Sequence, residues 1–489
     1  MKYPISNIEQ KENIVNDYYL LPFKFERNVD GDEVIVNEIG DYLVVPEGTV
    51  EKITTKEIDK INDSELFNRL HSNFFISEIP LQNYLNILAN RYTTKKSFLN
   101  DFTALHIIVM TLRCNQDCHY CQVSKVRKES SKHKFDINLK TLMKTIEFIF
   151  LSPSEHLTIE FQGGEPLIRF DLIKAAVEYA EQINISMRRK LTFVICTNLS
   201  YASKEILEYC KEHQVLISTS VDGPEIVHNN NRPNKQFNSY DKTISQIELA
   251  RNTLGQDRVS ALLTISKFSL SYPNKIIDEY IRLGFTEIFL RGLNPYGEAV
   301  KNKNEISYSV EEYVEFYKTA LERIVEYNHK GIYCVEVFSK LVLTKMLSPF
   351  PMGFVDLQSP SGIINNVLLY NYDGNIYPSD EARMLAEMGD THFHLGSVFN
   401  NYSEVIFNNT TSELASVWAT EYIAGCSDCA FQSYCGIDPV RNYNLEKSIY
   451  GFRPNSDHCI KMKAIINYLI QKIENDKSFR LLAYKWTAN

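Results

Sequence analysis

The 489-residue chain lacks several features that mark common classes of protein. No stretch reaches the roughly 18 consecutive apolar residues of a membrane-spanning helix, so we expect no membrane association. Residues 1–6 have no apolar stretch like that of a secretory signal, and we therefore expect a cytoplasmic location. Basic residues are not in excess, since 52 Lys and Arg face 61 Asp and Glu, with a net charge of −9. This balance argues against a dedicated nucleic-acid-binding protein.

Internal repeats and low-complexity tracts are also absent, so a repeat architecture is excluded. Apolar residues make up 44% of the chain and charged residues 23%, which is typical of a soluble globular protein. A length of 489 residues exceeds one ordinary hydrophobic core, so we predict two or three domains.

Cysteine, by contrast, is well represented. The ten cysteines occupy positions 114, 118, 121, 196, 210, 334, 426, 429, 435 and 459. Seven of them fall at metal-ligand spacings, which in a chain without an export signal indicates reduced thiols and metal rather than disulfides. Cys196, Cys210 and Cys334 lie in apolar runs instead, and we predict that they pack in the core.

Cys114, Cys118 and Cys121 form the pattern C-x3-C-x2-C, with Tyr120 just before the last cysteine. Iron–sulfur cubanes normally take four cysteines. Three thiolates in one loop can bind three irons of a [4Fe–4S] cluster and leave the fourth iron open to a substrate or cofactor. The alternatives are a zinc knuckle that lacks one ligand, and three unrelated cysteines.

This spacing, with its aromatic residue, resembles that of the radical S-adenosylmethionine (radical SAM) enzymes. The resemblance implies that SAM chelates the open iron and is cleaved reductively to a 5′-deoxyadenosyl radical, which abstracts hydrogen from a substrate. It also implies that Gly163-Gly164-Glu165-Pro166 holds the SAM amino group and that Asn198 and Ser220 contact SAM. Arg232 and Arg291 are candidate clamps for a carboxylate, because a guanidinium binds a carboxylate in two places.

Apolar strand-like runs alternate with helix-like stretches between about 104 and 330. The expected strands are 104–112, 157–162, 191–197, 215–221, 259–266 and 286–291. Continuous apolar strands separated by helices predict a parallel sheet covered by helices. The polar clusters named above follow the strands at their carboxyl ends, which share one mouth in a β/α barrel. We predict an α/β fold, a partial (β/α)6 radical SAM barrel with one composite site.

Three domains are predicted around this barrel. Residues 1–100 read as a small α+β module, a possible docking element for a leader peptide by strand addition. Its alternative role is a stabilising cap. Residues 101–335 form the barrel. Residues 336–489 contain a hairpin that turns at Asp373-Gly374, a second cysteine group and a closing amphipathic helix from about 460 to 475.

Cys426, Cys429, Cys435 and Cys459 resemble the SPASM extension of radical SAM enzymes that modify peptides and proteins. Full SPASM domains hold two auxiliary [4Fe–4S] clusters with seven cysteines. Here Ser379 and Pro439 stand where cysteines of the inner cluster are expected. The resemblance therefore implies two clusters in all, one that binds SAM and one auxiliary. The alternative is a structural zinc on the same four thiolates.

Asp380 directly follows the hairpin sequence Tyr377-Pro378-Ser379. In sulfatase-maturing relatives, an aspartate at this place acts as the base during substrate oxidation. A carboxylate near a radical centre can accept the proton that oxidation releases. Asp380 is therefore a candidate catalytic residue, and the alternative is a solvent-facing carboxylate at the end of a hairpin.

The segments 20–25 and 37–43 resemble the start of the radical SAM maturase of the His-Xaa-Ser system. This likeness implies a ribosomally made peptide or small protein as substrate, and an external electron donor such as flavodoxin or ferredoxin. Two alternatives remain open. One is a sulfatase-type maturase that makes formylglycine, and the other is an iron–sulfur scaffold or electron carrier without chemistry of its own.

Overall fold

The computed structural model describes residues 18–28, 30–453 and 456–488. The chain divides into two compact units: residues up to Lys95 with Asp428–Ser433 form the first, and Lys96–Ser427 with Tyr434–Asn489 form the second. Within the described residues, no helix is long and apolar enough to cross a membrane.

The first unit contains both strands and helices. Its strands are β1 (Tyr19–Leu20), β2 (Phe23–Arg27), β3 (Glu33–Asn37), β4 (Tyr42–Val45) and β5 (Ile76–Ser77). Its helices are α1 (Thr49–Thr54), α2 (Ser64–Ser72) and α3 (Leu81–Lys95). Strands β2, β3 and β4 form an antiparallel sheet with β2 and β4 at its edges, and β1 pairs with β5. Edge strands are what strand addition requires, but the docking role stays a prediction.

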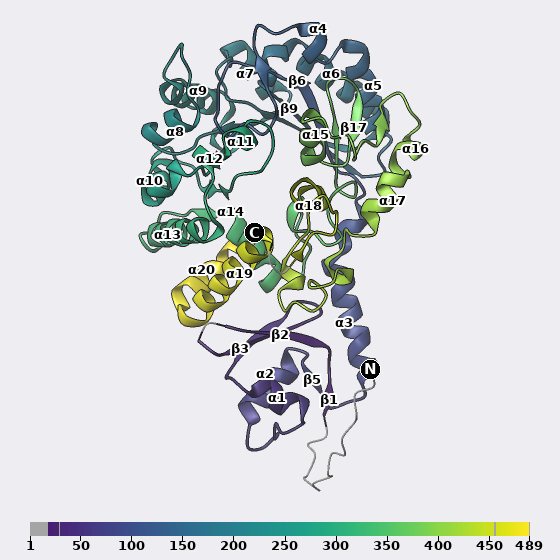
Figure 1. Ribbon diagram of the computed structural model, residues 1–489, viewed down its shortest axis with the longest axis vertical. Coiled ribbons are helices and arrows are strands. Elements are labelled where there is room, and N and C mark those ends of the chain that lie inside the picture. Colours follow the sequence, from purple (N-terminus) through teal and green to yellow (C-terminus); the bar gives the residue numbers. More distant parts are fainter. Residues whose placement is uncertain (1–17, 29, 454–455, 489) are drawn as a thin grey trace. The chain divides into compact units, whose positions relative to one another are not determined.

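The second unit contains the barrel, in which each parallel strand is followed by at least one helix (Figure 1). Its parallel strands are β6 (Leu105–Thr111), β9 (His156–Gly163), β10 (Lys190–Cys196), β11 (Leu216–Ser220), β12 (Val259–Thr264) and β14 (Leu290–Arg291). They lie side by side in chain order. The covering helices are α5 (Leu139–Ile149), α6 (Phe170–Met187), α7 (Lys204–Glu212), α9 (Ser239–Leu254), α10 (Pro273–Arg282) and α13 (Val310–His329). The predicted six-unit partial barrel is confirmed.

Local sequence signals explain where these helices begin. The side chains of Asn138 and Ser203 accept hydrogen bonds from the backbone N–H groups of Thr141 and Ile206 and so cap α5 and α7. Pro273 occupies the first turn of α10, where its missing N–H costs nothing. These local signals fix the residues at which the covering helices begin.

The hairpin after the barrel joins the barrel sheet. Strand β16 (Val367–Tyr370) pairs in parallel with β6, and β17 (Asn375–Tyr377) and β18 (Gly396–Ser397) extend the sheet antiparallel. The sequence predicts this hairpin but not its pairing with the first barrel strand. The remaining principal helices are α14 (Val337–Leu347), α15 (Asp380–Glu387), α18 (Pro439–Glu446), α19 (Asp457–Asn475) and α20 (Lys477–Thr487).

Candidate active site in the barrel

One cavity of about 200 Å³ lies at the carboxyl ends of the barrel strands. Its wall includes the three thiols of Cys114, Cys118 and Cys121. It also includes Gly163, Gly164, Asn198, Ser220, Arg232 and Arg291. Residues predicted from six separate segments of the sequence thus face one space, as the shared mouth of a β/α barrel requires.

The cysteine loop is fixed by backbone hydrogen bonds from distant loops. The His119 N–H donates to the Asn231 carbonyl at 3.1 Å, and the Glu298 N–H donates to the Cys121 carbonyl at 2.7 Å. At its stem, the Gly164 N–H donates to the Thr111 carbonyl at 2.7 Å. The loop therefore has a defined shape that does not depend on its own side chains.

Gly163 and Gly164 are required by a close approach of two backbones. A Cβ on Gly164 would lie 2.5 Å from the Arg113 carbonyl oxygen and 2.6 Å from that of Leu112. Gly163 has a φ of +138°, and a Cβ there would overlap the Thr111 carbonyl. The resemblance to radical SAM enzymes predicts that these glycines bind SAM. The structure adds that they allow the backbone leading into Cys114 to pack directly against them.

Glu165 lies behind the glycines and does not line the cavity. Its fully buried carboxylate accepts hydrogen bonds from the Thr197 hydroxyl at 2.6 Å, the Asn198 N–H at 2.8 Å and the Leu167 N–H at 3.0 Å. Burial raises the pKa of Glu165 to about 7, and these three donors oppose the rise. Pro166 is also buried, and the predicted contact of both residues with SAM stays a prediction.

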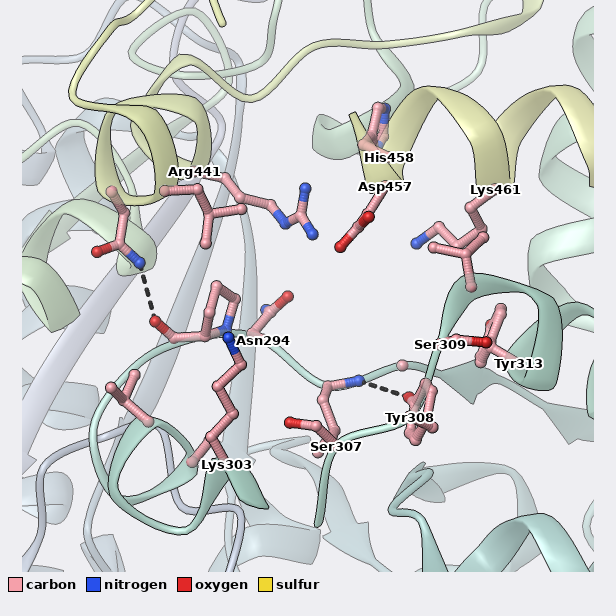
Figure 2. Close-up of a pocket in the computed structure, with 18 of the residues that line it drawn as sticks. Asn294, Lys303, Ser307, Tyr308, Ser309, Tyr313, Arg441, Asp457, His458 and Lys461 are labelled. Atoms are coloured by element: carbon pink, nitrogen blue, oxygen red, sulfur yellow. Dashed lines mark hydrogen bonds between the residues drawn. The ribbon is translucent and has the colours of Figure 1, made fainter. Parts of the chain in front are cut away.

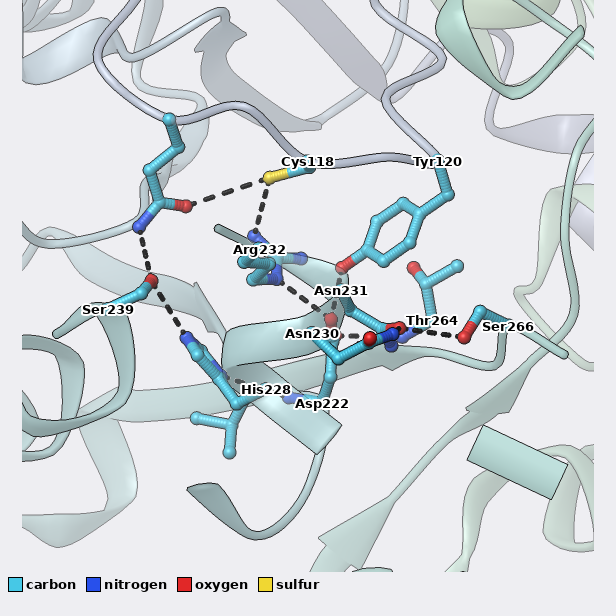
Figure 3. A network of polar contacts seen from close by, with 12 residues as sticks. Cys118, Tyr120, Asp222, His228, Asn230, Asn231, Arg232, Ser239, Thr264 and Ser266 are labelled. Atoms are coloured by element: carbon cyan, nitrogen blue, oxygen red, sulfur yellow. Dashed lines mark hydrogen bonds and ion pairs between the residues drawn. The ribbon is translucent and has the colours of Figure 1, made fainter. Parts of the chain in front are cut away.

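Arg232 belongs to a polar network around Cys118 (Figure 3). Its Nε donates to Asp222 Oδ2 at 3.1 Å, and its Nη1 lies 3.9 Å from Cys118 Sγ. Tyr120 donates its hydroxyl to the same Asp222 oxygen at 2.5 Å. Burial raises the pKa of Cys118 to about 11, and the Arg232 guanidinium lowers it in part. The structure thus places Arg232 beside Cys118, a predicted cluster ligand, which is a more specific position than the predicted carboxylate clamp.

Sequence reasoning assigned no role to several further residues on the cavity wall, among them Gln162 and Cys196. The prediction that Cys196 only packs in the core was wrong, whereas Cys210 and Cys334 are fully buried as expected. The available signal was strand alternation, because Glu160 and Gln162 share one face of β9 and Cys196 ends the next strand. Burial raises the pKa of Cys196 well above its ordinary value, and the neighbouring Glu160 adds to the rise.

The donors present fit a cluster and a cofactor. In a cubane each cysteine binds a different iron, so the thiols must face a common space rather than one point. The described residues contain no group of three or more His, Cys, Asp or Glu side chains arranged to hold a single metal ion. The Gln162 Nε2 has no hydrogen-bond partner among the described residues, although it is buried in the cavity wall. A buried, unpartnered donor of this kind fits a ligand with acceptor atoms.

The second cysteine group is divided between the two units. Cys426, Cys435 and Cys459 lie in the second unit, and Cys429 lies in the segment 428–433 of the first. Arg453 is 5% exposed and acts electrostatically on Cys426 and Cys435. Its Nε and Nη2 atoms have no hydrogen-bond partner in the described part of the chain. A buried guanidinium with free donors fits an anionic group held by these thiolates.

Asp380 begins helix α15 and does not line the cavity. Its carboxylate accepts a hydrogen bond from Arg383 Nη2 at 2.8 Å. Arg383 is fully buried, and its Nη1 donates to the carbonyl of Val123, a cavity-wall residue just after Cys121. Asp380 also acts electrostatically on Glu160, whose pKa it helps burial to raise.

Glu381, the next residue on α15, has a carboxylate whose burial can be tested by measuring stability at different pH values. Burial, with the neighbouring carboxylates of Asp438 and Asp356, raises the pKa of Glu381 from 4.5 to about 8. The folded chain therefore keeps a proton that the unfolded chain releases. This stabilisation is complete below pH 4.5 and is lost as the pH rises toward 8. We expect Glu381→Gln to flatten the fall of Tm across this window, measured by calorimetry. Glu248→Gln, on the exposed face of α9, should leave the slope unchanged, and an unchanged slope in Glu381→Gln would contradict the assignment.

Comparisons with known proteins agree with this geometry. Residues 108–279 match the model of the Radical SAM superfamily. The chain is 25% identical over 257 residues to the radical SAM cyclopropyl synthase TigE of Paramaledivibacter caminithermalis, which is 49% of this chain and 53% of that one. It is 23% identical over 279 residues to a cysteine-type anaerobic sulfatase-maturating enzyme of Clostridium perfringens strain 13, covering 55% of this chain and 71% of that one.

A solved structure, native anSMEcpe with bound AdoMet, superimposes with a TM-score of 0.63 at 20% identity. The superposition covers 77% of this chain and 100% of that one, and it shows a shared fold. The chain spans only about half the length of TigE. The three-cysteine loop at the mouth of a six-stranded parallel barrel, matched over residues 108–279, identifies a radical SAM domain with homology to SPASM-type maturases.

Proposed function

We propose that this chain is a radical SAM enzyme that modifies a ribosomally made peptide or small protein. The observation that carries the proposal is the single cavity in which three thiols of one loop face the polar inner ends of the barrel strands. A scaffold or electron carrier needs neither an open coordination position nor a ring of polar side chains around it. The similarity to TigE and to a sulfatase-maturating enzyme supports a polypeptide substrate.

The residues of this chain have distinct parts in that reaction. Cys114, Cys118 and Cys121 would hold a [4Fe–4S] cluster, and the backbone at Gly163-Gly164 with Asn198 and Ser220 would hold SAM beside it. Arg232 places positive charge next to one thiolate. When bound, the cluster and SAM supply a 5′-deoxyadenosyl radical that abstracts a hydrogen atom from the substrate.

The assay that tests the proposal is anaerobic incubation of cluster-reconstituted protein with dithionite and SAM. We expect formation of 5′-deoxyadenosine, detected by liquid chromatography. Co-expression with candidate precursor peptides, followed by mass spectrometry, should show a mass change of the peptide only when this chain is present. Fully reconstituted protein that forms no 5′-deoxyadenosine would favour the scaffold. The identity of the physiological reductant, a flavodoxin or a ferredoxin, is part of the same proposal.

A sulfatase-type maturase is the second candidate, favoured by the similarity to the Clostridium perfringens enzyme. Ser379 and Pro439 stand where that candidate needs cysteines of an inner auxiliary cluster, which weakens it. Mass spectrometry separates the two. Conversion of a cysteine or serine to formylglycine in a sulfatase peptide would select the maturase, and a cross-link or thioether in a small precursor would fit the His-Xaa-Ser type of system.

The auxiliary group is proposed to be a [4Fe–4S] cluster on Cys426, Cys429, Cys435 and Cys459. Arg453 supports an anionic cluster, because it is buried, has free donors and interacts electrostatically with Cys426 and Cys435. Metal analysis of anaerobically purified protein decides between the two metals. A content of about eight irons per chain would support two cubanes. A content of about four irons and one zinc would indicate a structural zinc in place of the auxiliary cluster.

Asp380 is proposed as the base that accepts the substrate proton. Asp380→Asn keeps the shape of the side chain and removes its basicity. We expect peptide product to fall by about two orders of magnitude, the usual contribution of a general base, while 5′-deoxyadenosine still forms. Glu387→Gln, at the other end of α15, is the matched control and should keep product formation. Undiminished product in Asp380→Asn would remove Asp380 from the mechanism.

A further inference from the structure

A second cavity, of about 370 Å³, adjoins the first and shares Gly292 and Asn294 with it. One wall is the chain after β14, residues 292–310, and the other comes from helices α18 and α19 (Figure 2). A polypeptide whose reactive residue occupies the first cavity would thus have the second cavity beside it.

Three cations from three different helices line this second cavity. They are Lys303 on α12 (Lys303–Ile306), Arg441 on α18 and Lys461 on α19. Asp457 is the one carboxylate on the described wall. No carboxylate of the described residues forms an ion pair with the side chains of Lys303, Arg441 or Lys461. The wall thus has a net positive charge in a chain whose overall charge is −9.

The nearby charges do not cancel this excess. Asp438 acts on Arg441 from outside the wall, but it caps α18 and its carboxylate already accepts the Arg441 backbone N–H at 3.0 Å. Asp457 acts on Lys461 from the wall itself, and Asp356 and Cys435 act on it from outside the wall. The Lys461 charge is therefore partly offset, which leaves Arg441 and Lys303 as the cations available to a ligand.

Neutral polar groups complete the wall. In Figure 2, Arg441 and Asp457 point into the space from one side and Asn294 and Ser307 face it from the other. The Tyr308 hydroxyl is already used, since it accepts from the Leu293 N–H at 3.0 Å and donates to the Ile265 carbonyl at 3.1 Å. Two unpaired cations with an amide and a hydroxyl nearby form a site that suits a carboxylate.

We propose that this second cavity binds an aspartate or glutamate side chain of the substrate polypeptide, close in sequence to the residue that is modified. The inference rests on the proposed function and makes it more specific, because it assigns an acidic residue to the substrate. An acidic side chain would place its carboxylate against Arg441 and Lys303. A neutral or basic residue at the same position would leave those cations unpaired.

Binding of short peptides to the reconstituted full chain tests this site without any radical chemistry. The probes are two capped tripeptides, acetyl-glycyl-aspartyl-glycinamide and the otherwise identical asparaginyl peptide, with affinities measured by calorimetry or NMR titration. We expect the aspartyl peptide to bind about tenfold more tightly, the difference that one charge-assisted contact of about 1.4 kcal/mol supplies. Equal affinities would overturn the proposal.

Two variants locate the preference in this cavity. Arg441→Gln should remove most of it, and Lys303→Glu, at an exposed position, should reduce it without a risk to folding. Lys211→Gln, on the exposed face of α7, is the matched control for the loss of one positive charge and should keep the preference. A preference that is unchanged in both Arg441→Gln and Lys303→Glu would place the carboxylate elsewhere and overturn the proposal.

The two proposals fail separately. An aspartyl preference in protein that forms no 5′-deoxyadenosine would keep the carboxylate site and reject the radical SAM activity. Modification of a precursor peptide by protein with no aspartyl preference would keep the activity and reject the site.

Discussion

Replacing Cys118 with alanine is expected to reduce 5′-deoxyadenosine formation below detection and to halve the iron content, from about eight to about four irons per chain. Cys118 faces the cavity beside Cys114 and Cys121, and no other thiol of the same loop can replace it. With only two cysteines left, a second iron of the cubane has no protein ligand, and the chain does not retain the cluster. Iron analysis and electron paramagnetic resonance of the anaerobically purified variant measure the result.

Cys210→Ala is the matched control for this substitution. Cys210 is fully buried on α7, away from both cysteine groups in the sequence, and burial alone raises the pKa of its thiol. We expect this variant to keep its iron and its SAM cleavage. Full iron content together with SAM cleavage in Cys118→Ala would contradict the assignment of the three-cysteine loop.

The barrel could be predicted because its signals are local. Apolar runs such as 191–197 give strands, capping residues such as Ser203 start the helices, and parallel strands place their carboxyl ends together. These rules need no knowledge of which side chain contacts which. Cys196 was misread because an apolar run alone does not tell which face of a strand points inward.

Contacts between distant segments could not be predicted. Arg232 reaches Cys118 only because α8 (Glu225–Asn231) ends where Asp222 holds its guanidinium, which is a matter of tertiary packing. The second cavity depends on how α18 and α19 pack near residues 292–310, and the spacing of Arg441 and Lys461 gives no sign that they converge. Hydrophobic periodicity predicts which face of a helix is buried, but it does not predict which element packs against that face.

Gly164→Ala is expected to destabilise the chain by about 3 kcal/mol, the upper end of the cost of adding a methyl group to a packed interior. The added Cβ would meet the carbonyl oxygens of Arg113 and Leu112, and backbone atoms cannot turn aside as a side chain does. The strand that leads into Cys114 would have to shift, breaking the hydrogen bond from the Glu165 N–H to the Arg113 carbonyl at 2.9 Å. Chemical denaturation measures the loss, and SAM affinity should fall with it.

Gly353→Ala separates this steric cost from a general effect of removing glycine. Gly353 has no atom within 4 Å of an added Cβ, so alanine there should cost little or slightly stabilise the fold by restricting the unfolded chain. Equal stability of the two variants would show that the backbones at Gly164 and Arg113 are not in close contact. A loss of stability in Gly164→Ala alone, together with weakened SAM binding, would show that the geometry of the cysteine loop depends on the absence of a side chain at Gly164.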